Sequence, residues 1–60
     1  IVRVRHINDT ARIEVLPDQI GELVSKREEI VKVFLEIGYK YVTIDLQGYR
    51  MGSLNEVLLT

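Results

Sequence analysis

The fold is decided by residues 2–15, VRVRHINDTARIEV, in which two alternating runs flank a short polar turn. Residues 2–6 and 11–15 each alternate with a period of two, which is typical of β-strands that have one apolar face. Asn8 and Asp9 lie between the runs, and both residue types tolerate the positive φ of a tight turn. We therefore predict a β-hairpin with Asn8 and Asp9 at its tip.

A two-residue loop also determines which residues face each other across the hairpin. Counting outward from the tip, the predicted pairs are Ile7 with Thr10, His6 with Ala11, Arg5 with Arg12, Val4 with Ile13, Arg3 with Glu14, and Val2 with Val15. The apolar pairs all fall on one face. A slip of one residue would move the valines to the opposite face, so the turn length and the apolar pattern support the same register.

Residues 17–37 are predicted to be helical. Pro17 suits a first helical position, because its missing N–H would be unpaired there in any case. Ser25-Lys26-Arg27-Glu28 matches a capping box, so we expect a short helix to about Val24 and a longer one from Lys26 to Ile37. Gly38 is expected to end the longer helix in a left-handed conformation.

Residues 40–46 return to a period of two and predict a third strand, with Val42, Ile44 and Leu46 facing inward. A right-handed crossover would lay the helix over the apolar face of the sheet. We predict a small α+β domain, a ββαβ layer, whose strand order stays open with the third strand beside the first favoured. Ser53-Leu54-Asn55-Glu56 repeats the capping-box pattern, so a short C-terminal helix or tail is expected.

The composition limits the function. Sixty residues make a single domain that buries only about 60% of its unfolded surface, and there is no Cys and one His to supply a disulfide or a structural metal. We therefore expect a supporting partner surface. The net charge of −1 argues against a nucleic-acid or membrane binder, and the absence of a signal-peptide or membrane-span pattern predicts a cytoplasmic protein. Because the chain opens at Ile1 on a strand-like run, we interpret it as part of a longer protein.

The face opposite the apolar pairs carries Arg3, Arg5, Arg12 and Glu14, together with Tyr41, Thr43 and Asp45 if the third strand has the stated polarity. Arg5 directly across from Arg12 is unfavourable unless an anion or a carboxylate lies between them. The alternative is a solvated face on which Arg3 pairs with Glu14 and Arg12 with a neighbouring acid, each pair contributing roughly 0 to 1 kcal/mol. The residues alone do not decide between these interpretations.

Two further features of the sequence are candidate sites. Residues 48–53, GYRMGS, could present backbone N–H groups to a phosphate, but the spacing matches no phosphate-binding fingerprint, and an ordinary loop is the favoured interpretation. His6 lies on the apolar face, where a partly buried, hydrogen-bonded imidazole is expected. No second ligand or matched nucleophile accompanies it, so we predict neither a metal site nor a catalytic residue.

Three stretches together resemble the C-terminal end of the LarE-type family of ATP-dependent sacrificial sulfur transferases, within the PP-loop superfamily of ATP-utilising enzymes. They are residues 2–6 (VRVRH), residues 11–15 (ARIEV), and residues 41–46 (YVTIDL) continuing through residues 48–56 (GYRMGSLNE). The sequence departs from the usual family pattern at Ile7-Asn8 and at Met51.

The resemblance implies that residues 1–60 form one C-terminal accessory domain. The nucleotide-binding domain on its N-terminal side, with ATP and Mg, would carry the adenylating chemistry that leads to a nickel-pincer cofactor. It also implies that Arg3 and Arg5 line an anion or phosphate site, to which we add Arg12 and Arg50 from the matching motifs. The expected partners are that nucleotide-binding domain, a phosphate-bearing small-molecule substrate and further copies in a homo-oligomer. The competing hypothesis is a structural module without a ligand.

Overall fold

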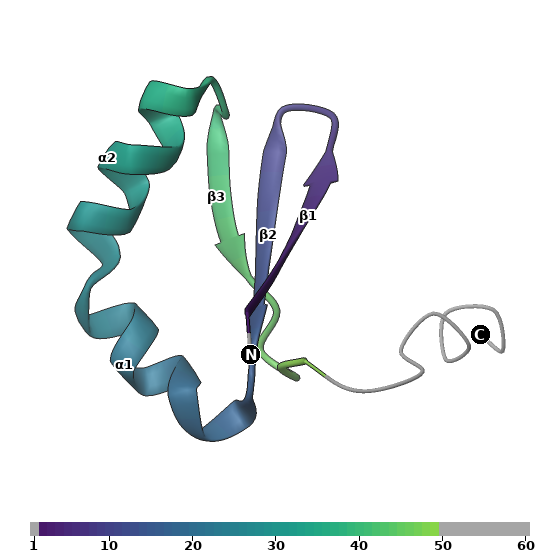
Figure 1. Cartoon of the computed structure of the whole chain (residues 1–60), viewed down its shortest axis with the longest axis vertical. Coiled ribbons are helices and arrows are strands. Elements are labelled where there is room, and N and C mark those ends of the chain that lie inside the picture. Colours follow the sequence, from purple (N-terminus) through teal and green to yellow (C-terminus); the bar gives the residue numbers. More distant parts are fainter. Residues whose placement is uncertain (1, 50–60) are drawn as a thin grey trace, which may run out of the picture.

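The structure, a computed structural model, describes residues 2–49. The hairpin strands β1 (Val2–Ile7) and β2 (Thr10–Val15) are followed by a 3-10 turn η1 (Pro17–Gln19), helices α1 (Ile20–Ser25) and α2 (Arg27–Ile37), and strand β3 (Tyr41–Ile44) (Figure 1). This order confirms the predicted α+β class and its ββαβ arrangement. The expected C-terminal helix or tail lies outside the described residues.

The hairpin has the predicted register throughout, from Val2 opposite Val15 to Ile7 opposite Thr10. Asn8 takes a φ of 51° at the tip. Asn adopts this left-handed region more readily than most residues, because its short side chain can hydrogen-bond locally. The turn residues and the apolar alternation therefore favour the same hairpin.

The strand order corrects the sequence-based preference, because β3 lies beside β2 and not beside β1. The two strands are parallel, with Ala11 beside Val42 and Ile13 beside Ile44. Lys40 and Tyr41 donate backbone hydrogen bonds to the Asp9 carbonyl at 2.8 and 3.2 Å, which anchors the start of β3 at the hairpin tip. The helices thus connect neighbouring strands, and β2 becomes the central and most buried strand.

The helical segment breaks at Lys26, one residue after the predicted place, and not through a capping box. The Ser25 hydroxyl donates to the Glu22 carbonyl at 2.6 Å, and Lys26, the N-cap of α2, makes no side-chain cap hydrogen bond. Gly38 ends α2 with a φ of 127°, a positive value that disfavours a side chain.

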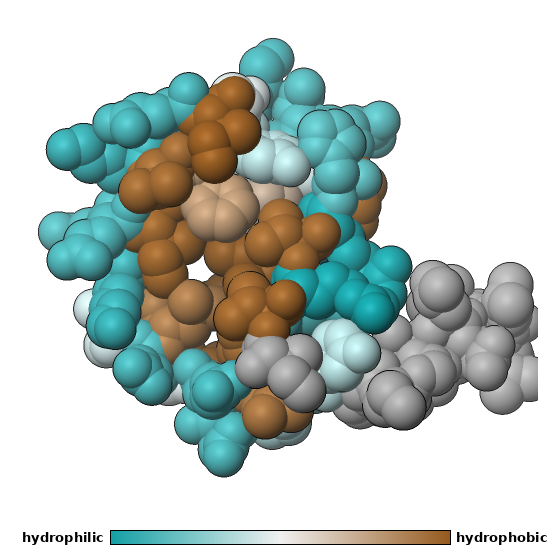
Figure 2. All heavy atoms as spheres, viewed as in Figure 1, coloured by the Kyte–Doolittle hydropathy of each residue, from teal (hydrophilic) through white to brown (hydrophobic). Residues whose placement is uncertain are grey.

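The apolar core lies between the helices and the central strand. Ala11, Ile13 and Val15 of β2 are buried. A hollow of about 60 Å³ under the helices is lined by Ile13, Leu23, Arg27, Ile30, Val31, Val42 and Ile44. Apolar side chains gather between the helices and the sheet, while polar ones cover the outer helix surface (Figure 2). The helices therefore cover the apolar face of β2 and β3.

Strand β1 is covered less well than its neighbours. Val2 is 67% exposed and Val4 is 44% exposed, although both lie on the apolar face. Because β3 pairs with β2, the crossover places the helices over those two strands and leaves the apolar side of β1 open to solvent.

The segment after β3 differs from the expected continuation of the strand. Leu46, predicted to face inward, is 80% exposed, because the strand ends at Ile44 and a turn follows. The Asp45 carboxylate accepts a hydrogen bond from the Gln47 N–H at 2.9 Å, and the Asp45 carbonyl accepts one from the Gly48 N–H at 3.0 Å. After this turn the chain passes the end of β2, where the Tyr49 N–H reaches the Val15 carbonyl. Among the described residues, no helix is long and apolar enough to cross a membrane.

Candidate anion-binding face

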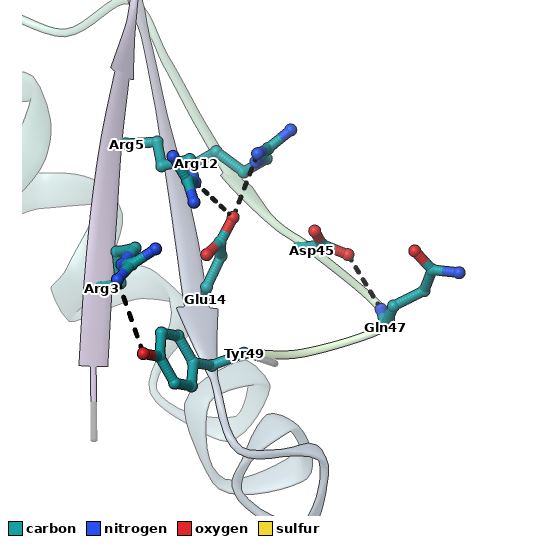
Figure 3. A network of polar contacts seen from close by, with 7 residues as sticks. All are labelled: Arg3, Arg5, Arg12, Glu14, Asp45, Gln47 and Tyr49. Carbon is teal, nitrogen blue, oxygen red and sulfur yellow. Dashed lines mark hydrogen bonds and ion pairs between the residues drawn. The ribbon is translucent and has the colours of Figure 1, made fainter. Parts of the chain in front are cut away.

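Three arginines project from the sheet on the side that the helices leave uncovered. Ile13 of β2 and Ile44 of β3 line the hollow beneath the helices. Side chains alternate along a strand, so Arg12 and Glu14 lie on the opposite face, and the hairpin register places Arg5 and Arg3 beside them. We call Arg3, Arg5, Arg12 and Glu14 the arginine face (Figure 3).

Glu14 is the shared partner of two of these arginines. Its Oε2 atom accepts from Arg5 Nε at 2.9 Å and from Arg12 Nη2 at 3.0 Å. The Glu14 side chain is only 3% exposed, whereas those of Arg5 and Arg12 are 22% and 38% exposed. A buried carboxylate needs compensating charge and hydrogen bonds, and here two guanidinium groups supply them.

This geometry answers the question raised by Arg5 opposite Arg12. A carboxylate does lie between the two guanidinium groups. It comes from Glu14, diagonal to Arg5 and two positions along the same strand from Arg12. The alternative expectation, an ion pair between Arg3 and Glu14, is wrong. The directly opposed residues do not form an ion pair, and Glu14 is used by the other two arginines.

The arginine face keeps an excess of positive charge. Arg5 and Arg12 share the carboxylate of Glu14, and Arg3 pairs with no acid among residues 2–49, so these four residues carry a formal charge of +2. In addition, Glu14 Oε1 and Arg12 Nε are both buried without a hydrogen-bond partner in the described part of the chain. Such atoms are uncommon in folded proteins. The formal charge of the four residues, and not these unpaired atoms, is what would favour an anion here.

Arg3 is held by a different residue, Tyr49. The guanidinium carbon of Arg3 lies 4.8 Å from the centroid of the Tyr49 ring, a distance typical of a cation–π contact. Arg3 Nη2 also lies 3.5 Å from the Tyr49 hydroxyl, at the long limit for a hydrogen bond (Figure 3). Arg3 is exposed and forms no ion pair among residues 2–49.

Tyr49 reaches Arg3 because of the turn at Gly48. Gly48 has a φ of 81°, and a Cβ there would lie 2.8 Å from the Val15 carbonyl oxygen and 3.1 Å from the Pro17 ring. The Tyr49 N–H donates to the same Val15 carbonyl at 2.6 Å. Only glycine fits this close approach, which brings residue 49 next to the end of β2 and to the start of β1.

The other predicted features lie elsewhere. His6 is hydrogen-bonded, as expected, with its Nδ1 atom 2.9 Å from the Tyr39 hydroxyl, but it is exposed and not partly buried. It borders a shallow hollow of about 280 Å³ near the hairpin tip. Within residues 2–49, no group of three or more His, Asp or Glu side chains could hold a metal ion. Arg50, the fourth predicted anion-binding residue, lies outside the described residues.

Sequence reasoning placed Glu14 and the three described arginines on one face but missed two contacts of that face. It did not identify Glu14 as the bridge between Arg5 and Arg12, although its spacing from Arg12 and its diagonal position to Arg5 carried that signal. It also treated Tyr49 only as part of a loop. No local pattern predicts the contact between Tyr49 and Arg3, which are 46 positions apart.

Comparison with known proteins identifies relatives that are similar to this chain in sequence. No protein-family model matches the chain. An uncharacterized protein of Synechocystis sp. is 48% identical over 59 residues, covering 95% of this chain and 22% of the relative. The pyridinium-3,5-bisthiocarboxylic acid mononucleotide synthase of Lactiplantibacillus plantarum is 40% identical over 57 residues, covering 95% of this chain and 21% of the synthase.

An uncharacterized protein of Methanocaldococcus jannaschii is 39% identical over 49 residues, covering 82% of this chain and 19% of the relative. The chain therefore spans about a fifth of the length of the curated relatives it matches.

Proposed function

We propose that this chain is the C-terminal accessory domain of an ATP-utilising sulfur transferase of the PP-loop superfamily, and that its arginine face binds a phosphate group of the substrate or adenylate. The observation that carries the proposal is the set of three guanidinium groups on the bare side of the sheet with one carboxylate among them. The similarity to a synthase whose name specifies a mononucleotide supports it, because a mononucleotide carries a phosphate.

The chemical contribution of this face would be positioning and charge. Guanidinium groups bind phosphate through charge-assisted, often bidentate hydrogen bonds. Holding the phosphate in a fixed orientation lowers the entropic part of the barrier for a reaction at another part of the substrate. The nucleotide-binding domain implied by the resemblance would bind ATP and Mg and supply the groups that make and break bonds. Further copies of the protein would contact one another in the expected homo-oligomer.

Arg3→Ala and Arg5→Ala in the full-length protein test this proposal. Loss of one charge-assisted contact to phosphate should weaken binding by about 2 kcal/mol, or roughly thirtyfold. We expect a higher KM or Kd for the phosphate-bearing substrate and slower sulfur transfer, with assembly unchanged by light scattering. Lys32→Ala, which removes an exposed charge from α2, is the matched control. Unchanged substrate affinity in both arginine variants would refute a phosphate site on this face.

A second candidate function, an assembly module without a ligand, is favoured by the exposure of Val2 and Val4 on the apolar side of β1. Since these valines and the arginines lie on opposite faces of one strand, the two functions are separable. The assembly hypothesis expects Val4→Thr to lower the oligomer mass while substrate affinity is retained. If Arg3→Ala lowers the oligomer mass, the assembly surface includes the arginine side of the strand.

A further inference from the structure

The three described arginines of the arginine face are held in two different ways. Arg5 and Arg12 are bound to Glu14, so their orientation is set by a carboxylate buried in the sheet. Arg3 has no ion pair within the described chain and is oriented only by Tyr49. The most exposed positive charge of the face therefore depends on a residue from the turn after β3.

We propose that Tyr49 is a positioning residue that presents Arg3 to a phosphate group, acting through the face of its ring. The inference rests on the proposed function, because it requires the arginine face to bind phosphate. An exposed arginine samples many rotamers, and fixing its side chain before binding reduces the ordering cost that the ligand must overcome. A tyrosine ring restrains the guanidinium group without neutralising its charge.

The ring, and not the hydroxyl, carries this effect. The guanidinium carbon lies 4.8 Å from the ring centroid, well within the range of about 6 Å for a cation–π contact. The hydroxyl is 3.5 Å from Arg3 Nη2, where a hydrogen bond contributes little. Phenylalanine should therefore replace Tyr49 in this role, whereas leucine should not.

The backbone around Tyr49 holds the ring in place. The Tyr49 N–H is bound to the Val15 carbonyl at 2.6 Å, and the Gly48 turn packs against Pro17. These contacts use backbone atoms and Gly48, so a substitution of the Tyr49 side chain leaves them intact. The side-chain variants can thus separate orientation of Arg3 from folding of the turn.

The test is a double-mutant cycle on Arg3 and Tyr49 in the full-length protein, with the Kd for inorganic phosphate measured by calorimetry. Tyr49→Leu should raise that Kd about two- to fivefold, as expected for loss of an exposed cation–π contact. Tyr49→Phe should remain close to the unsubstituted protein. Arg3→Ala should raise the Kd further, and adding Tyr49→Leu to Arg3→Ala should change nothing more, because the two residues act together.

Tyr41→Leu is the matched control, since Tyr41 lies on the same face of the sheet at the far end of β3 and is 64% exposed. It should leave phosphate affinity unchanged. Circular dichroism checks that each variant is folded. For the phosphate-bearing substrate, Tyr49→Leu should raise KM more than it lowers kcat.

The experiment distinguishes failure of the positioning role of Tyr49 from failure of the phosphate site. If Arg3→Ala weakens phosphate binding but Tyr49→Leu does not, or if the two effects multiply in the double variant, the positioning role is refuted and the phosphate site stands. If Tyr49→Phe loses as much affinity as Tyr49→Leu, the ring does not carry the effect. If Arg3→Ala leaves the Kd unchanged, Arg3 takes no part in phosphate binding and Tyr49 has nothing to position.

Discussion

Glu14 separates two guanidinium groups that face each other across the hairpin. Arg5 and Arg12 are cross-strand partners, and a like-charge pair at such a position destabilises a sheet. Oε2 of the buried carboxylate accepts from both at about 3 Å, so the repulsion becomes a shared ion pair. Glu14 is in this way both a member of the arginine face and part of the folded interior.

Glu14→Gln should therefore destabilise the fold. The amide keeps the shape but leaves Arg5 and Arg12 without a counter-charge, and we expect the free energy of unfolding to fall by roughly 2 kcal/mol, because both arginines can still reach water. Urea denaturation measures the change. Glu28→Gln on the exposed surface of α2 is the control and should shift the midpoint very little. An equal effect of both variants would show that Glu14 has no special role.

Two glycines of this fold, Gly21 and Gly48, differ in whether a side chain would fit at their position. Gly21 lies inside α1, where a Cβ would meet nothing within 4 Å. Gly48 lies in the turn after β3, where a positive φ and the Val15 carbonyl exclude a side chain. The first glycine weakens its helix without a packing reason, whereas the second is required by the close approach of two backbones.

Alanine at these two positions should accordingly have effects of opposite sign. Gly21→Ala should raise the free energy of unfolding by about 0.5 to 1 kcal/mol, because alanine restricts the unfolded chain and favours helix. Gly48→Ala should lower it by roughly 2 kcal/mol or more, through backbone strain and the clash with Val15. Thermal denaturation of both variants compares them directly. Stabilisation by Gly48→Ala would contradict the described turn.

The core as a whole is small and unevenly covered. Among residues 2–49, the buried apolar side chains are those of Ala11, Ile13 and Val15, all on the central strand. Strand β1 keeps an open apolar side, as the exposure of Val2 shows. Domains of this size have little stability to spare, so each central contact is a large share of the total.

Ile13→Ala should therefore unfold much of the population at room temperature. Truncating a buried isoleucine costs about 2 to 5 kcal/mol, which is comparable to the whole stability expected of a domain of this size. Far-UV circular dichroism with urea titration measures the loss. Val33→Ala on the exposed side of α2 should change the free energy of unfolding by less than about 0.5 kcal/mol. Similar losses for both variants would contradict a core centred on β2.

Residues 2–15 by themselves determined the hairpin, its register and the gathering of Arg3, Arg5 and Arg12 on one face, because strand alternation and a two-residue turn are local properties of the chain. The helix break near Lys26 was also predicted locally, from the sequence of residues 25–28, although the capping box expected there does not form.

Tertiary structure alone decided that β3 lies beside β2 and that the apolar side of β1 stays open. It also decided that Glu14 binds Arg5 and Arg12, whereas Tyr49 contacts Arg3. These features depend on which distant segments pack together, as between Arg3 and Tyr49, 46 positions apart. Such contacts form only when all strands and helices pack together, because their stability depends on the surface buried and the charges paired in the complete fold. No short stretch of sequence contains a pattern that predicts them.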